Sequence, residues 1–301
     1  HTSATLAPGG FANFNDSIAG CNDFIQWVIT LFMYLAGVNF ILHFRALRGE
    51  IKNMLFNREL MFYNGVILVA VLLSIGVLYF NGLAPEEIAR GQFRNVPMTE
   101  ENFSVHYHTQ GQFLESFYNT VRISFFQVIS VVTTTGFVTV DFDLWPDFLR
   151  FMLIFLMFFG GCAGSTGGGI KMIRIMIVFK VALNILRKLT QPKLVAPIKV
   201  GDQVFDDDRV INIVSFFILF TGLFILTAFL MTIFIPDLTT AIACSIATIG
   251  NIGPGLAGVG AIENYGWIPL PGKWILVMSM LLGRLEIFTV LIVLRPAVWR
   301  K

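Results

Sequence analysis

The chain contains 301 residues, of which 13% are charged and 55% are hydrophobic, and its formal net charge is only +2. An ordinary soluble domain carries roughly 25% charged residues. This composition excludes a disordered chain, a nucleic-acid-binding module and most soluble enzymes. It predicts a membrane protein whose surface faces lipid. The small net charge gives no overall electrostatic field that would attract an acidic partner.

Five apolar segments have the length of a membrane-spanning helix, which needs about 20 residues. The third is interrupted by a glycine-rich stretch, and the fifth contains Arg284 and Glu286 near its centre. The segments are residues 24–44, 60–80, 144–182, 210–235 and 274–294. The sequence therefore predicts an all-α polytopic membrane protein.

Loop charge predicts the orientation of these spans, because cytoplasmic loops carry an excess of Lys and Arg. The basic segments 45–58, 183–208 and 295–301 are predicted to be cytoplasmic, together with the C-terminus. The loops 81–112 and 256–272 are predicted to lie outside.

Two shorter apolar stretches, 113–132 and 238–249, are too short to span, so the segments 113–143 and 236–255 are predicted to enter and leave the membrane on its outer side. We predict that each is a half-helix followed by returning extended backbone. Such backbone is tolerated at membrane depth only where it is buried in protein or lines a water-filled path.

The order of span, half-helix, glycine-containing return and span occurs at 60–182 and 210–294, and its second half occurs at 1–44. The common orientation of these units argues against the inverted repeats of many secondary transporters. The predicted units are residues 1–58, the end of one repeat, 59–208, a repeat with a broken second span, and 209–301, a further repeat.

The three turns read LAPGGF at residues 6–11, VTTTGF at 132–137 and IGNIGP at 249–254. Aligned on one glycine, they place Gly10, Gly136 and Gly253 in equivalent positions. Backbone carbonyls directed at one axis can replace the hydration shell of a cation, and glycine reaches the dihedral angles that this requires. The turns hold no carboxylate, which favours a monovalent cation. The alternative is that they are ordinary glycine-containing loops.

Four stretches resemble the Trk/Ktr/HKT superfamily of potassium transporters, and most closely its bacterial TrkH branch. They are VVTTTGFVTVDF, GGCAGSTGGGIKMIR, ATIGNIGPG and LLGRLEIFTVL. The resemblance implies M1–pore-loop–M2 units around a central pore, as in potassium channels, with four repeats that each contribute one filter strand. It also implies K⁺ contacts from the carbonyls of Pro8, Gly9, Gly10, Thr134, Thr135, Gly136, Asn251, Ile252 and Gly253.

The glycine-rich stretch is the candidate gate. Glycine costs about 1 kcal/mol relative to alanine inside a helix, so the six glycines here should break the helix below the filter, with Ser165 and Thr166 bonding the freed backbone groups. The glycines are Gly160, Gly161, Gly164, Gly167, Gly168 and Gly169. The resemblance also implies an intramembrane gate at this place. The alternative is close helix packing through Gly160, Gly164 and Gly168. Lys171, directly after the stretch, is either a gate element or a marker of the inner membrane boundary.

Arg284 is the second gate candidate. An arginine at the centre of a membrane helix costs about 2.5–3.5 kcal/mol on insertion scales. We therefore predict that Arg284 lies below the filter, where it interacts with the gate loop and repels cations. The alternative is an arginine bonded to backbone carbonyls between helices.

The leading hypothesis is a pore-forming subunit of a potassium uptake system. The alternatives are a secondary transporter coupled to H⁺ or Na⁺ and a nonconducting assembly subunit. The sequence contains no Ser/His/Asp set, phosphate loop or metal-ligand cluster, so neither enzyme activity nor a cofactor is predicted for this chain.

The resemblance further implies a homodimer in the bacterial inner membrane that binds a cytosolic ring of TrkA-type regulatory subunits. Nucleotide would bind that ring, since nothing in this chain resembles a nucleotide site. No nucleic-acid partner is expected. Because His1 falls inside a half-helix and three filter strands cannot close a fourfold pore, we expect this chain to be part of a longer transporter and not to conduct ions by itself.

Overall fold

The computed structural model describes residues 2–10, 12, 17–80, 110–191, 197–201, 203–285, 288 and 292. Several parts of the sequence prediction lie outside the described residues: His1, most of the outer loop 81–112, Glu286 and the basic tail 295–301. The orientation of the C-terminus is therefore a prediction from sequence alone.

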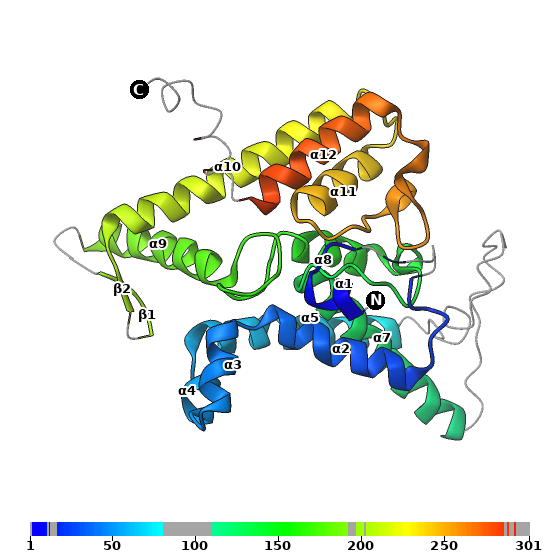
Figure 1. The fold of residues 1–301 in the computed structure, drawn as a ribbon, viewed down its shortest axis with the longest axis horizontal. Coiled ribbons are helices and arrows are strands. Elements are labelled where there is room, and N and C mark those ends of the chain that lie inside the picture. Colours follow the sequence, from blue (N-terminus) through cyan, green and yellow to red (C-terminus); the bar gives the residue numbers. More distant parts are fainter. Residues whose placement is uncertain are drawn as a thin grey trace.

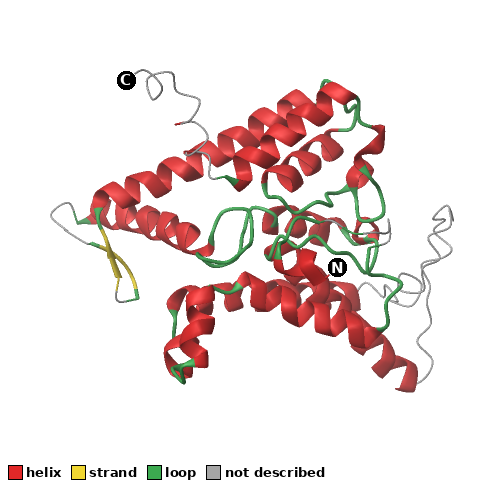
Figure 2. Ribbon diagram, viewed as in Figure 1, coloured by secondary structure: helices red, strands yellow, loops and turns green. Residues whose placement is uncertain are grey.

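The described chain is almost entirely helical, with one small β-hairpin (Figure 2). The helices are α1 (Thr2–Leu6), α2 (Asp23–Gly37), α3 (Phe40–Leu47), α4 (Ile51–Leu55), α5 (Arg58–Phe80), α7 (Gln110–Val132), α8 (Asp147–Leu156), α9 (Met172–Thr190), α10 (Asp207–Met231), α11 (Leu238–Ile249) and α12 (Leu270–Arg284). Short 3₁₀ turns are η2 (Phe142–Leu144), η3 (Ala257–Val259) and η4 (Tyr265–Trp267). The hairpin pairs β1 (Ile198–Val200) antiparallel with β2 (Gln203–Phe205).

The helices form two groups with irregular backbone between them. Figure 1 shows α2, α5 and α7 along one side of the molecule and α10, α11 and α12 along the other, in agreement with the contacts within each group. Helix α8 and the loops lie between the groups, and α9 contacts both α5 and α10. The β-hairpin covers a small separate core of Ile177, Val200 and Val210.

Two helices are long and apolar enough to cross a membrane, namely α5 with 23 residues and α10 with 25. They confirm the spans predicted at 60–80 and 210–235. The segment at 144–182 is broken as expected, because α8 and α9 are separated by irregular backbone from 157 to 171. Helix α11 has 12 residues and is buried around its whole circumference in its second half, as a half-helix inside the protein must be.

The segment at 24–44 differs from the prediction of a single span. It consists of α2 and α3, which meet at an angle of 102°. Asn39 begins the second helix, and its Oδ1 accepts the N–H of Ile41 at 2.8 Å. The bend exposes backbone groups that the glycine-rich loop then binds: Cys162 donates its N–H to the Gly37 carbonyl at 2.8 Å, and Phe40 donates to the Gly164 carbonyl at 3.2 Å.

Candidate ion-conduction site

The three glycines that the sequence aligned on separate turns meet at one place in the fold. Gly10, Gly136 and Gly253 have φ angles of 74°, 71° and 106°, in the left-handed region that glycine alone adopts at little cost. A Cβ added to either Gly136 or Gly253 would lie 2.7 Å from the Cα of Gly10. Their equivalence, inferred from three short patterns, is therefore matched by their geometry and by their position.

The turns after α7 and α11 share one backbone conformation. Thr134 and Asn251, two residues before their glycines, both have left-handed φ angles, of 59° and 55°. In each turn the next residue donates its N–H five residues back: Thr135 to the Ser130 carbonyl at 2.9 Å, and Ile252 to the Ala247 carbonyl at 2.8 Å.

The first turn departs from this conformation. It has Pro8 at the matching position, where the ring holds φ near −65° and excludes the left-handed region. Gly9 nevertheless lines a cavity of 450 Å³ together with Gly10, Gly136 and Gly253. The irregularity of LAPGG thus has a backbone cause.

The turns are packed directly against one another. Gly10 donates its N–H to the Thr135 carbonyl at 2.8 Å, so one predicted ion ligand is occupied by a backbone bond. A Cβ on Gly136 would lie 1.8 Å from the Ile252 carbonyl oxygen, which is also close to Gly10. The structure therefore brings the predicted filter residues together in a closed arrangement, and their role as K⁺ ligands stays a prediction.

The hydroxyl groups behind the second turn brace its backbone. Thr133, Thr134 and Thr135 are fully or almost fully buried. Thr133 Oγ1 lies 2.7 Å from the Ile129 carbonyl oxygen, to which it donates, and 2.8 Å from Thr135 Oγ1. The hydroxyl of Thr133 therefore bonds within the turn and stiffens it.

The glycine-rich loop lies against the turns, at the C-terminal ends of α7 and α11. Gly168 donates its N–H to Thr134 Oγ1 at 2.7 Å. A Cβ on Gly168 would lie 2.2 Å from the Gly250 carbonyl oxygen, and one on Gly167 would lie 3.2 Å from that of Thr133. A single glycine therefore touches two filter turns, in the place where the sequence predicted a gate.

The loop is closed by its own bonds. Gly160 donates its N–H to the Ile170 carbonyl at 2.8 Å, and Ile170 donates to the Phe158 carbonyl at 3.0 Å. Lys171 Nζ donates to the Ser165 carbonyl at 3.2 Å and also to the Gly167 carbonyl, so its side chain belongs to the loop.

The geometry of the loop bears on two further predictions from the sequence. Thr166 Oγ1 lies 3.5 Å from the Ala36 carbonyl oxygen and bonds backbone as expected, whereas Ser165 Oγ accepts from Lys171 at 3.4 Å. The stretch is not helical, so close helix packing through Gly160, Gly164 and Gly168 does not apply to it.

Glu59 is a loop-binding residue that the sequence analysis missed. Its side chain is only 7% exposed, although it lies at the first turn of α5. Glu59 Oε1 accepts the N–H of Ala163 in the loop at 2.6 Å and that of Ile173 in α9 at 3.3 Å. A carboxylate directly before the apolar segment 60–80 was the available sequence signal.

Arg284 lies at the end of α12, next to the inner side of the third turn. The neighbouring Gly283 packs so closely that a Cβ would lie 1.9 Å from the Ile249 carbonyl oxygen. The Arg284 side chain is exposed, and within the described residues no hydrogen bond or ion pair joins it to the loop. Its interaction with the gate stays a prediction.

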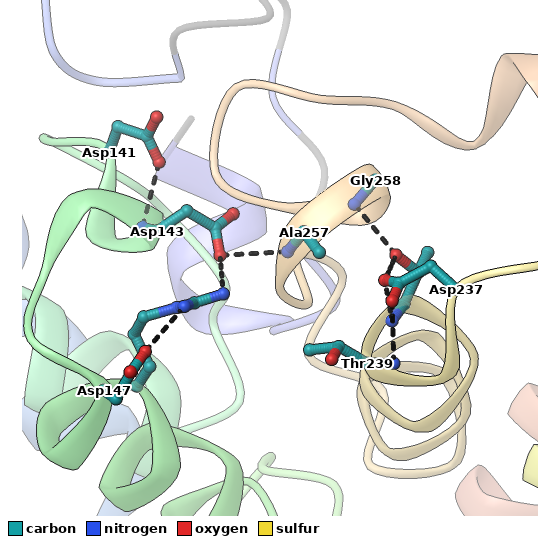
Figure 3. Close-up of polar contacts among 9 residues, drawn as sticks. Asp141, Asp143, Asp147, Asp237, Thr239, Ala257 and Gly258 are labelled. Atoms are coloured by element: carbon teal, nitrogen blue, oxygen red, sulfur yellow. Dashed lines mark hydrogen bonds and ion pairs between the residues drawn. The ribbon is translucent and has the colours of Figure 1, made fainter. Parts of the chain in front are cut away.

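The outer ends of the turns are held by two carboxylates, which Figure 3 shows on either side of the segment 257–258. Asp143 Oδ1 accepts the N–H of Ala257 at 2.9 Å and lies 3.6 Å from the guanidinium of Arg150. Asp237 Oδ2 accepts the N–H of Thr240 at 2.8 Å, and Thr240 Oγ1 in turn accepts the N–H of Gly258 at 3.1 Å.

Burial raises the pKa of Asp143 from 3.8 to about 6. The hydrogen bond from Ala257 and the positive charge of Arg150 lower this pKa, whereas the negative charges of Asp141 and Glu263 raise it further. Asp143 therefore titrates in a range in which ordinary carboxylates are fully ionised.

Comparison with known proteins identifies relatives over the whole chain. The model of the TrkH family, a cation transport protein family, matches residues 1–301. The chain is 33% identical to the Trk system potassium uptake proteins TrkH of Salmonella typhimurium and Escherichia coli, over 100% of this chain and 56% of each relative.

The structure is similar to the crystal structure of the potassium transporter TrkH from Vibrio parahaemolyticus, with a TM-score of 0.81 and 30% sequence identity. The match covers 99% of this chain and 58% of that one. It confirms the predicted all-α membrane fold. The chain spans about half the length of the curated relatives that it matches.

The raised pKa of Asp143 predicts a pH-dependent stability. Between about pH 4 and pH 6 the folded protein holds a proton on Asp143 that the unfolded chain has released. The free energy of unfolding should therefore fall as pH rises from 4 to 7, and Asp143→Asn should lose this part of the dependence. Melting temperatures measured across this range test the prediction, with Asp147→Asn as the control. An unchanged pH slope in Asp143→Asn would contradict it.

Replacement of Glu59 by glutamine should loosen the glycine-rich loop. The substitution keeps one acceptor oxygen but removes the charge that strengthens the bonds to Ala163 and Ile173. We expect a loss of about 1–3 kcal/mol in local stability, measured as faster amide hydrogen exchange of residues 160–173. The exposed Glu50→Gln is the matched control, and equal exchange in both variants would refute the anchoring role.

Proposed function

Because the chain belongs to the TrkH family of cation transport proteins, we propose that it forms pore-lining repeats of a potassium uptake protein. Membership of this family means that it is a transport protein and not an enzyme. The observation that carries the proposal is the meeting of Gly10, Gly136 and Gly253, all with left-handed φ angles, from three turns of which the second and third share one backbone conformation.

The filter would bind K⁺ through backbone carbonyls. Gly136 and Gly253 follow Thr134 and Asn251, whose left-handed backbone turns the intervening peptide units toward the meeting point. The described turns contain no carboxylate, which suits a monovalent ion that must bind and then leave. In a conducting state the three glycines would separate around the axis on which they now meet.

The loop 160–171 would act as the gate. Its bond from Gly168 to Thr134 and its contact with Gly250 place backbone directly beneath two filter turns. Lys171 closes the loop from within, which keeps a positive charge near the ion path. Opening would require the loop to move away from these turns while the bond from Ala163 to Glu59 keeps the loop attached to α5.

The membrane setting and the partners follow from the same family membership. The protein would reside in the bacterial inner membrane with the basic segments 45–58 and 183–208 in the cytoplasm. It would form a homodimer and bind a cytosolic, nucleotide-binding ring of TrkA-type subunits. Both segments carry Lys and Arg that suit such a cytosolic contact as well as the membrane topology.

Rubidium uptake into proteoliposomes tests the proposed pore. The proteoliposomes should contain the whole protein in the form in which its native cells make it. Gly136→Ala should reduce uptake at least about 10-fold, because Gly136 has a φ angle of 71°, a left-handed conformation in which an alanine is strained. Gly65→Ala in α5 is the matched control, since its Cβ would meet nothing within 4 Å. Full uptake by Gly136→Ala would refute the filter.

The same assay separates the alternatives. Uptake driven by the K⁺ or Rb⁺ gradient alone supports a channel. Uptake that requires a proton or Na⁺ gradient supports a coupled secondary transporter, and the absence of uptake supports a nonconducting assembly subunit.

Shortening the loop should increase conductance. Deletion of Gly164 to Gly167 removes the acceptor for Phe40 and three acceptors for Lys171, namely the Ser165 carbonyl, Ser165 Oγ and the Gly167 carbonyl. It also draws Gly168 away from Thr134. Single-channel current or initial rubidium flux measures the change in a variant that elutes as a folded protein. Unaltered flux in such a variant would contradict the gate.

A further inference from the structure

A groove on the predicted inner side of the molecule is unexplained by ion conduction. It lies between the start of α5, the middle of α9 and the hairpin strand β1, and it has a volume of 610 Å³. Three basic and three apolar side chains line it: Arg58, Lys180, Lys199, Met61, Phe62 and Met176. We call it the inner basic groove.

The positive charge of the groove is not neutralised within the part of the chain that the structure describes. The lining contains no acidic side chain. The ion pairs between described residues involve Arg122 and Arg150, and none includes a cation of the groove. Lys180 Nζ donates to the Lys199 carbonyl, which holds the ammonium group of α9 next to the hairpin.

The apolar wall of the groove continues from a membrane-spanning helix. Met61 and Phe62 lie in the first turn of α5, which is long and apolar enough to cross a membrane. Met176 precedes Lys180 by four residues, so both lie on the same face of α9. Cations and apolar side chains therefore line one groove, at the level where α5 begins at Arg58.

We infer that the inner basic groove binds an anionic phospholipid, with its phosphate near Arg58, Lys180 and Lys199 and an acyl chain along Met61, Phe62 and Met176. Basic pockets between helices at the cytoplasmic membrane surface bind such headgroups. A free phosphate would use the cations but would leave the apolar wall without a ligand. The proposal concerns binding alone and does not depend on whether the pore conducts.

The inference is tested by adding phosphatidylglycerol to the delipidated full chain and measuring the bound lipid by native mass spectrometry. The variant with Arg58→Gln, Lys180→Gln and Lys199→Gln should bind roughly 100-fold more weakly, because each of the three basic residues near an anionic surface contributes about 1 kcal/mol. The matched control carries Arg48→Gln, Arg187→Gln and Lys188→Gln, which remove the same charge outside the groove. Equal weakening in both variants would overturn the site.

Two lipid competitors decide the chemistry of the ligand. Phosphatidylcholine with the same acyl chains should bind the wild type at least about 10-fold more weakly than phosphatidylglycerol, and equal binding would overturn the inference. Inorganic phosphate at millimolar concentration should leave the lipid bound. Displacement of the lipid by phosphate would assign the groove to a free anion instead.

A wild-type measurement keeps the test independent of variant folding. Photoreactive phosphatidylglycerol in a lipid bilayer should label peptides that contain Met61 or Met176. Labelling confined to other peptides would overturn the inference. The charge-conserving variant with Arg58→Lys, Lys180→Arg and Lys199→Arg should retain binding within about 3-fold, because the number of cations near the headgroup is unchanged.

Discussion

Irregular backbone at membrane depth must find hydrogen-bond partners inside the protein, and this requirement shapes the centre of the molecule. The loop 160–171 meets it by binding other irregular parts. Cys162 donates to the carbonyl at the bend between α2 and α3, Ala163 donates to Glu59, and Gly168 donates to Thr134. The bend, the loop and the filter turns are therefore mutually dependent, because each supplies bonds that the others lack.

The same dependence explains why glycine recurs where backbones cross. A Cβ on Gly160 would lie 2.0 Å from the Gly168 carbonyl oxygen, and one on Gly283 would lie 1.9 Å from that of Ile249. These contacts join the loop to itself and α12 to the third turn. The loop also meets the third turn directly, since a Cβ on Gly168 would lie 2.2 Å from the Gly250 carbonyl oxygen.

The filter turns are braced differently on their two sides. On the side predicted to face outward, Asp143 accepts the N–H of Ala257 (Figure 3), and Thr240 accepts that of Gly258. On the inner side, the brace is the glycine-rich loop, which is attached to α5 by a buried carboxylate. The first brace consists of two direct hydrogen bonds, whereas the second is a loop that both backbone and side-chain bonds hold in place.

The sequence by itself determined the membrane class, the break at 157–171 and the equivalence of Gly10, Gly136 and Gly253, because these depend on local composition and on glycine's backbone freedom. It did not determine the 102° bend between α2 and α3, which was predicted as one span, because the bend is stabilised by Cys162 and Gly164 far along the chain. Nor did it find Glu59, whose function depends on a loop more than 100 residues away, as their separation of 104 shows. Only the tertiary structure decided these contacts, because non-local hydrogen bonds leave no periodic signal in the sequence.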